Sequence, residues 1–492
     1  MLGCKQQRQP KLFYSLVNLD ERIRPDNPLR KIRDIIDFSF VRPKVEHFYG
    51  IRGNPSIDPI VLIKLMLILF LESIPSEREL MRRLPERLDW LWFCEYDLDS
   101  ELPDHSVLSK ARRRWGAELF RTFFQNVLIQ CLKAGLVDGQ VVHIDSSMIH
   151  ANASVDSLKP AFAVLADKIY QKLEGSCSKL PEQSSDNIEA QTKLSPTDPD
   201  ARCRVKGKQK VLGYQEHRCV DDTNGIITAT ITTGAAVHEG EILEELIEIH
   251  ESDTQSKVST VVADKAYGRA ENYKKVKAKN ITPCIPHAKS RGCGEGKFSR
   301  DDFQYDGVKD CYVCPNGKEL KRQTRKPVNR NEHMYKASRK DCQRCPLRAN
   351  CYSGKYSKRV YRHEDQDVID WADNCMSKPR RRYFMGRRQA VAEGSFADAA
   401  NNHGYKRSRW RGLERMTIQN LLIASIQNLR KLIAGSSRTG RKFAATTSIC
   451  LVHLMFIRLL QRLYLKIAIR IPLRMRKMNL IRLDVNQAML LF

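Results

Sequence analysis

Apolar positions in the first third of the chain recur at the spacing of helices. A strongly apolar run over 60–71 follows Asp58 and a proline, and both residues favour the start of a helix. Ser76 and Glu79 then have the spacing of a capping box, which marks the start of a second helix. The pattern therefore predicts an all-α unit over 58–135.

This all-α unit carries one very basic helix, which is expected to begin near residue 104 and contains Arg112, Arg113 and Arg114. Such a helix suits a helix-turn-helix-like unit that binds DNA. A packed bundle with a solvated charged face produces the same pattern, so the sequence leaves both interpretations open.

The pattern changes after Gly139 to the alternation that is typical of strands. Strands are expected over 141–149, 211–220, 225–234, 258–264 and 281–289, with helices over 239–250 and 271–280. Alternating strands and helices of this kind indicate an α/β core with a mixed sheet.

Composition shifts divide the chain into five segments. They are an N-terminal helical region that binds DNA over 1–135, the first part of the core over 136–290, a cysteine-rich insertion over 291–375, the last helices of the core over 376–442, and a basic amphipathic tail over 443–492. For the tail, DNA binding, membrane-surface binding and a tail altered by truncation or frame change are all open interpretations.

The charge balance adds a class of partner to this outline. The chain has 84 Lys and Arg against 57 Asp and Glu, which gives a net charge of +27. Residues 376–442 alone hold 16 Lys or Arg against 3 Asp or Glu, so phosphates of DNA are expected to contact this segment. Anionic membrane is a second polyanion that composition does not exclude, although no apolar stretch reaches the roughly 20 residues of a spanning helix.

The 15 cysteines suggest metal at one place only. No signal peptide is visible, so a cytoplasmic, reducing compartment is expected, where clustered cysteines favour metal over disulfides. Cys311 with Cys314, and Cys342 with Cys345, form two C-x-x-C pairs that suit a structural Zn²⁺. Cys351 is a spare ligand or replaces one of the four, and reduced thiols packed in a loop are the alternative.

Three acids are candidates for catalysis by metal. Asp145 lies near the end of a predicted strand, Asp264 ends another, and Glu393 lies in a helical pattern. Two-metal chemistry on phosphodiesters needs carboxylates brought together from distant points of a chain. Each acid also has an ordinary interpretation: Asp145 as the cap of a turn, Asp264 as a helix cap, and Glu393 as a solvated helix position.

The residues around these acids form longer motifs. The segments HIDSSMIHANAS, GIITATITTGAAVHEG, VVADKAYGRAENY and AEGSFADAANNHGYKRSRWRGLERMTIQNLLIASIQNLRKL occur in this order. They resemble the DDE transposases of bacterial insertion sequences, in the group with a Tyr-Arg-Glu-Lys signature. The resemblance runs from about residue 56 to 432.

The resemblance implies a fold, an activity and its partners. It implies an RNase H-like core in which Asp145, Asp264 and Glu393 are catalytic and hold Mg²⁺ or Mn²⁺. One DNA strand would be cut at each element end, and the freed 3′-hydroxyl would then attack target DNA. Double-stranded DNA, a homodimer or larger assembly on DNA, and association with the nucleoid are expected, with no membrane.

The signature is not complete in this chain. Its Lys corresponds to Ala400 and its Arg to Gln389. Neighbouring basic residues are expected to contact DNA in their place: Arg387, Arg388, Lys406, Arg407, Arg409 and Arg411.

Two further functions stay open. A weakened descendant would bind element ends as a repressor, and a stand-alone RNase H-like nuclease would hydrolyse DNA without joining it. His143 and His238 are secondary site candidates, with a partly buried, hydrogen-bonded histidine as the alternative for each.

Overall fold

The computed structural model describes most of the chain up to residue 435. The described ranges are 18–50, 56–161, 164, 193–206, 209–287, 297–324, 331–351 and 356–435. The chain divides after Leu432 into two units, and only residues 433–435 of the second are described. The predicted tail over 443–492 lies outside the described residues.

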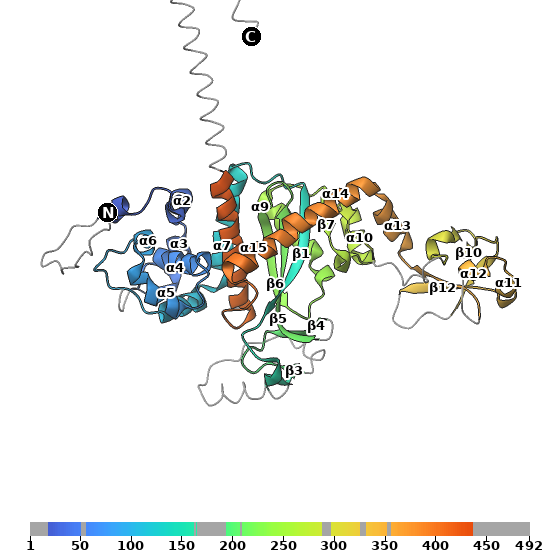
Figure 1. The fold of residues 1–492 in the computed structure, drawn as a ribbon, viewed down its shortest axis with the longest axis horizontal. Helices are drawn as coiled ribbons and strands as arrows, with labels where there is room; N and C mark the ends of the chain where they lie inside the picture. The colour runs from blue at the N-terminus through green and yellow to red at the C-terminus, as the bar shows by residue number, and fades with distance from the viewer. Residues whose placement is uncertain are drawn as a thin grey trace, which may run out of the picture. The chain divides into compact units, whose positions relative to one another are not determined.

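The N-terminal part is helical, as the apolar spacing predicted (Figure 1). Its helices are α1 (Leu19–Arg22), α2 (Pro28–Ile35), α3 (Val41–Val45), α4 (Pro59–Leu71), α5 (Glu77–Arg83), α6 (Leu88–Phe93) and α7 (Ser106–Lys133). Asp58 caps α4 by accepting the N–H of Ile60 at 3.0 Å. Ser76 caps α5 by accepting the N–H of Glu79. The Glu79 carboxylate binds the side chains of the following turn, so the described contacts contain half of the predicted capping box.

The core is a six-stranded mixed sheet, which confirms the predicted mixed α/β class (Figure 1). Its strands are β1 (Val141–His150), β4 (Arg202–Lys206), β5 (Gln209–Asp221), β6 (Ile227–Gly234), β7 (Thr260–Ala263) and β8 (Thr282–Cys284). The strand order is β4-β5-β1-β7-β8, and β6 also pairs with β5. The pairs β1–β5, β5–β6 and β4–β5 are antiparallel, whereas β1–β7 and β7–β8 are parallel.

The sheet register brings two of the predicted acids together. The last parallel pair between β1 and β7 joins Ile144 to Ala263. Asp145 and Asp264 are the next residues along the two strands, so they lie at the same level of the sheet. The sequence predicted that Asp145 lies near the end of its strand. This prediction is wrong, because β1 continues to His150 in its pairing with β5.

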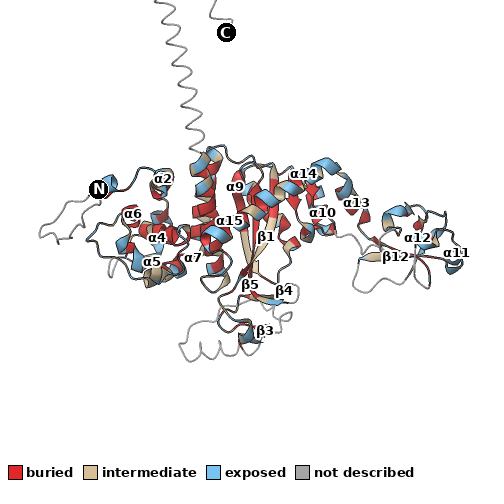
Figure 2. Cartoon of the chain, viewed as in Figure 1, coloured by how far each residue is buried: buried red, intermediate tan, exposed pale blue. Residues whose placement is uncertain are grey.

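The two faces of the sheet are covered by different helices. Apolar side chains of one face pack against α9 (Leu243–Thr254) and α10 (Ala270–Ala278). The other face lies beneath α14 (Lys378–Arg388), α15 (Gly394–His403) and a helix over 413–435. Figure 2 shows buried positions in the strands and in helices around them. On this second face, buried polar side chains of the sheet and of the helices contact one another.

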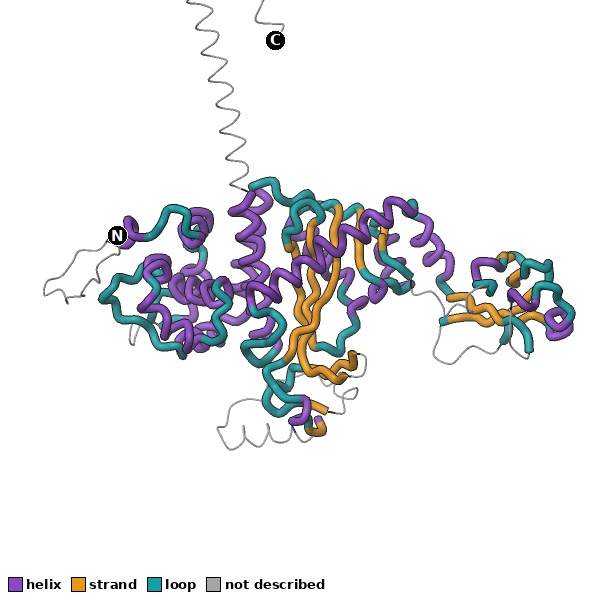
Figure 3. Tube along the Cα trace, in the orientation of Figure 1, coloured by secondary structure: helices purple, strands orange, loops and turns teal. Residues whose placement is uncertain are grey.

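The cysteine-rich segment forms a sheet of its own (Figure 3). Its strands are β9 (Gln304–Asp306), β10 (Cys311–Val313), β11 (Glu319–Arg322), β12 (Glu332–Ala337) and β13 (Arg359–His363), all paired antiparallel in the order β13-β12-β11-β10-β9. A small apolar cluster that includes Tyr312, Leu320 and Tyr335 is its core. Helix α13 (Gln366–Asn374) leads back to α14.

A buried ion pair joins the sheet to the helices over it. The side chains of Arg218 and Glu216, both on β5, are fully buried and 3.0 Å apart. The Arg218 guanidinium also donates to the carbonyl of Ser395 at 3.2 Å and to the side chain of Gln427 at 3.0 Å. The ring of Phe396 lies 4.5 Å from the same guanidinium. One side chain thus connects β5, α15 and the helix over 413–435.

Arg218→Met should lower the free energy of unfolding by about 3–5 kcal/mol, because it leaves the Glu216 carboxylate buried without its cation. Calorimetric melting of the full chain measures the change. Lys257→Met is the control, since Lys257 pairs with Glu251 at the surface and its side chain is 89% exposed. Equal melting temperatures for Arg218→Met and the parent would contradict the role of this pair.

Candidate active site

The three predicted acids come from three separate elements. Asp145 lies on β1, and Asp264 follows β7, where its carboxylate also accepts the N–H of Ala266 at 2.9 Å. Glu393 ends η8 (Gln389–Glu393), a π-helical turn between α14 and α15. Asp264 is therefore both a helix cap and a neighbour of Asp145, so its two interpretations are compatible.

Arg388 lies between two of these acids. Its guanidinium is 3.1 Å from Oδ2 of Asp145 and 2.7 Å from Oε1 of Glu393. The side chains of Arg388 and Asp145 are each only 13% exposed, so water screens this contact weakly. A cation thus occupies the space between carboxylates that are 248 positions apart in sequence.

The π-helical turn explains how Arg388 reaches Glu393. In an α-helix, a residue lies over the one four positions later, whereas a π-turn moves this relation to five positions. Arg388 precedes Glu393 by five and makes the contact. The signature places its arginine four residues before the glutamate, a position that Gln389 occupies here. The arginine that contacts Glu393 is Arg388, one residue earlier.

Two of the acids, Asp145 and Asp264, have raised pKa values. Burial raises the pKa of Asp145 to about 6, opposed by Arg388 and by the N–H of Ser146, while the charges of Asp264 and Glu393 add to the increase. Burial also raises the pKa of Asp264. Gathered, partly buried carboxylates with raised pKa values are the ordinary setting of a cation site.

These contacts bear on whether the acids can hold a metal ion. Over the described residues, no three His, Cys, Asp or Glu side chains lie close enough to share one metal ion. Hard oxygen ligands that already hold a guanidinium nevertheless suit a divalent cation, provided that Arg388 moves aside. The donor set fits a Mg²⁺ or Mn²⁺ ion on this condition.

A fourth carboxylate, Glu239, borders the acids. Its Oε1 accepts from Arg204 at 2.8 Å and from Gln215 at 2.7 Å, and Gln215 also donates to the hydroxyl of Ser146. Glu239 contributes to the raised pKa of Asp264. The sequence patterns pointed to neither Glu239 nor Gln215, because neither residue stands in a motif of its own.

The two candidate histidines have structural partners. His143 is buried, and its Nε2 lies 2.7 Å from Asp222, which also binds Arg387 at 3.0 Å. Burial lowers the pKa of His143, which favours the neutral ring. His238 caps the short helix that follows it by accepting the N–H of Gly240. These contacts are those of hydrogen-bonded histidines within the fold, the alternative interpretation of both residues.

Two of the predicted DNA-contacting residues belong to the loop after α15 and lie beside β1. Lys406 donates to the hydroxyl of Ser147 at 2.8 Å, two residues after Asp145. Arg407 forms an isolated parallel bridge with His150 at the end of β1. The loop is therefore joined to the strand that carries the first acid.

The other two basic residues of this loop contact more distant segments. Arg409 donates to the carbonyl of Leu69 and lies 4.3 Å from the ring of Phe70, and burial lowers its pKa to about 10. Arg411 donates to the carbonyl of Asn152 at 3.0 Å. Arg409 is thus committed to the N-terminal helices, whereas Arg411 is exposed.

The cysteines of the small sheet separate into two environments. Cys314, Cys342 and Cys351 pack against the same apolar cluster. Burial raises the pKa of Cys351, and the nearby thiols of Cys342, Cys345 and Cys314 add to this. Burial likewise raises the pKa of Cys311, but the charges that add to it are carboxylates. Cys351 therefore lies with Cys314, Cys342 and Cys345, whereas Cys311 lies among carboxylates.

Two family models match parts of the chain. Residues 17–114 match a model described as a transposase domain, and residues 313–433 match one described as a transposase DDE domain. Both models are of transposases, and they support the resemblance to the DDE transposases of insertion sequences.

Other comparisons add less. Among solved structures, the chain is similar to the piggyBac transposase in a synaptic complex with hairpin DNA, with a TM-score of 0.37 and 9% identity over 84% of this chain and 76% of that chain. A comparison with curated proteins found no match. Within the described ranges, no helix is both long and apolar enough to cross a membrane.

The raised pKa of Asp145 makes stability depend on pH. The folded protein holds this proton more tightly than the unfolded chain, so its stability falls as pH rises from about 4 to about 6 and is level above that. Asp145→Asn removes the ionisation. In metal-free buffer, the variant should gain on the order of 2 kcal/mol over the parent at pH 8 and nothing at pH 4.

Melting temperatures of the parent and Asp145→Asn across this pH range measure the effect. Asp26→Asn is the control, because Asp26 pairs with Arg24 at the surface and its side chain is 72% exposed. A stability difference between parent and Asp145→Asn that stays constant from pH 4 to pH 8 would show that Asp145 ionises normally.

Proposed function

We propose that this protein is a transposase that cleaves DNA strands and joins them to target DNA with a divalent metal held by Asp145, Asp264 and Glu393. The observation that carries the proposal is that the Arg388 guanidinium pairs with both Asp145 and Glu393, while the β1–β7 register brings Asp264 to the level of Asp145. Mg²⁺ or Mn²⁺, when bound, would stabilise the attacking and leaving oxygens of the phosphodiester.

The residues of the chain would position the reactants. The parallel pairing of β1 and β7 fixes Asp145 and Asp264 at one level of a rigid sheet. Arg388 neutralises the acids in the structure, and once displaced it can donate to phosphate oxygens a few ångströms away. Arg387, Arg388, Lys406, Arg407, Arg409 and Arg411 are the proposed DNA contacts of this segment.

The strand order supports an RNase H-like core for this chemistry. An antiparallel β6-β5-β1 arrangement followed by parallel β7 and β8 is the order of that fold. A stand-alone nuclease of the same fold would nick DNA without joining it, so strand transfer separates the two functions. Action as a homodimer or larger assembly on double-stranded DNA, in association with the nucleoid, is part of the proposal.

A weakened descendant that only binds DNA is the second candidate, because Ala400 and Gln389 depart from the signature. Two contacts favour activity instead. Arg388 reaches Glu393 across the π-turn, and Lys406 lies beside Ser147 on the catalytic strand. Basic groups are therefore present near the acids even though their spacing in sequence has changed.

Asp145→Ala, Asp264→Ala and Glu393→Ala should each lower metal-dependent cleavage of an element-end duplex by at least about a hundredfold, because loss of a ligand costs more than loss of its supporting contacts. A labelled duplex with Mg²⁺ or Mn²⁺ reports cleavage, and anisotropy reports binding. Glu248→Ala, at the surface of α9, is the control.

DNA binding by the parent without cleavage would favour the weakened descendant. Cleavage without joining to a supercoiled target would favour the nuclease. Undiminished cleavage by one of the three variants would remove that acid from the site.

We also propose a structural Zn²⁺ in the small sheet, bound by Cys314, Cys342, Cys345 and Cys351. This set keeps three of the four residues that the spacing suggested and exchanges Cys311 for Cys351. The N–H of Lys318 donates to Sγ of Cys314 at 3.4 Å, a contact that stabilises a thiolate.

Four thiolates suit tetrahedral zinc, although the thiols would have to approach one another further. A sheet of short strands with so small a core gains most from such a cross-link.

Cys351→Ser should weaken zinc or cobalt binding by at least about tenfold, whereas Cys311→Ser should bind like the parent. Metal content after purification and the thiolate absorption of the cobalt form are the measurements. Loss of metal in Cys311→Ser alone would restore the set read from the spacing. A parent that binds neither metal would mean that the thiols are simply reduced and packed.

A further inference from the structure

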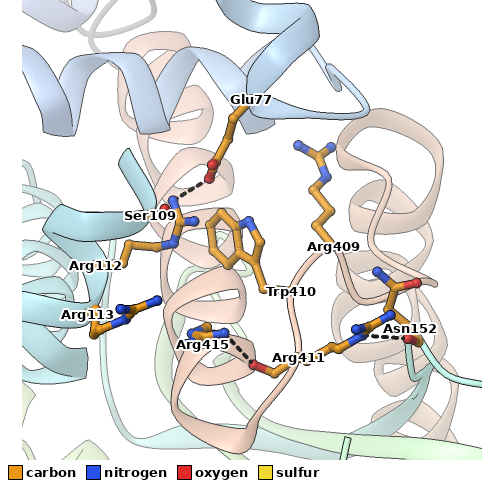
Figure 4. Close-up of a pocket in the computed structure, with 9 residues that line it drawn as sticks. All are labelled: Glu77, Ser109, Arg112, Arg113, Asn152, Arg409, Trp410, Arg411 and Arg415. Carbon is orange, nitrogen blue, oxygen red and sulfur yellow. Dashed lines mark hydrogen bonds and ion pairs between the residues drawn. The ribbon is translucent and has the colours of Figure 1, made fainter. Parts of the chain in front are cut away.

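A basic pocket lies where the N-terminal helices meet the loop after α15 (Figure 4). Its volume is about 290 Å³. The charged residues that line it are Glu77, Arg112, Arg113, Arg409, Arg411 and Arg415. Five cations with one anion repel one another unless a further anion joins them. The pocket lies apart from the acids and is not used by the chemistry above.

Two of these arginines hold the pocket together. Arg112 is buried, pairs with Glu77 at 2.5 Å and lies 3.8 Å from the ring of Trp410. Arg409 is committed to the carbonyl of Leu69. These contacts use the only acid in the lining and tie α5 and α7 to the loop. Arg112 and Arg409 thus have structural roles, and the other arginines of the pocket have no carboxylate in the lining to pair with.

The other three arginines have donors to spare. Arg113, Arg411 and Arg415 are all exposed. Arg113 has no hydrogen-bond or ion-pair partner in the part of the chain that the structure describes, and Arg411 and Arg415 each donate only to a backbone carbonyl. Each guanidinium carries five N–H donors, so most of them are unused. In the view of Figure 4, Arg415 lies between Arg113 and Arg411.

We propose that this pocket binds a backbone phosphate of duplex DNA through Arg113, Arg411 and Arg415. The inference rests on the proposed function, since it takes DNA as the substrate. Arginine forks match phosphate oxygens, and the pocket is lined by N–H donors from α7, from the loop and from the helix over 413–435. The contact would hold the N-terminal helices and the catalytic core on the same DNA.

A second cavity beside the pocket favours DNA over a small anion as the ligand. A second cavity of about 750 Å³ shares five of its lining residues, among them Asn152 and Arg411, so the site continues along the junction. The same loop is joined to β1 by hydrogen bonds between Ser408 or Lys406 and His150. A polymer can follow this path, whereas a single small anion would fill only the pocket.

The path gives a length scale for the DNA. Asn152 follows Asp145 by seven residues and lies just beyond the end of β1, so at a strand's rise the two are at most roughly 23 Å apart. Duplex DNA rises about 3.4 Å per base pair, so the pocket would bind a phosphate within about seven base pairs of the acids. A duplex of about 30 base pairs therefore reaches both places and is a suitable probe.

The test compares the triple variant Arg113→Gln, Arg411→Gln, Arg415→Gln with a triple control, Lys44→Gln, Lys133→Gln, Lys257→Gln. The control lysines are exposed and line neither cavity. Anisotropy of a labelled 30-base-pair duplex is measured from low to high salt with the full chain, and melting curves confirm folding. The pocket variant should bind at least about tenfold more weakly at low salt.

Its plot of log affinity against log salt should also be less steep by about 1 or more, as expected when phosphate contacts are lost. Equal affinities and slopes for the two triple variants would overturn the proposal. So would an unchanged slope together with inorganic phosphate raising the melting temperature of the parent but not of the pocket variant, since the pocket would then hold a small anion.

Cleavage by the parent is scored separately. A salt slope that differs between the parent and the pocket variant, while the parent never cleaves DNA, would contradict the proposed chemistry and support the phosphate pocket. Cleavage by the parent, with equal binding by the two triple variants, would support the chemistry and contradict the pocket.

Discussion

The buried guanidinium of Arg218 is the constraint on which the geometry of the core depends. Removing an arginine from water costs several kcal/mol unless its charge is paired and hydrogen-bonded, and here the partners come from β5, α15 and the helix over 413–435. All three segments must therefore be in place together. Glu393 lies two residues before Ser395, so the same requirement that satisfies Arg218 brings this acid to Asp145, the strand neighbour of Arg218.

The acids show how a sheet and a helix share one task. Parallel pairing fixes two carboxylates at one level without any contact between their side chains. The third acid lies at the end of the π-helical turn, and Arg388 pairs with this acid and with Asp145. The pairing offsets part of the repulsion between the carboxylates.

Features that depend on neighbouring residues could be predicted from the sequence. The caps at Asp58 and Ser76, the strand over β1 and the placement of Asp264 after β7 are local, and all are found. Glu239 and Gln215 could not be found this way, because their closeness to the acids depends on how β5 and the segment after β6 pack. The environment of Cys351 also appears only in three dimensions, since spacing alone favours the two C-x-x-C pairs.

The π-turn at 389–393 changes how relatedness should be judged along this helix. A π-turn is one extra residue within an α-helix, so it displaces every earlier side chain by one position in the sequence while leaving the contact across the turn intact. A comparison that counts fixed intervals would score Arg388 as a missing arginine. Divergent copies of such elements could therefore be discarded as decayed when only the count between two residues has drifted.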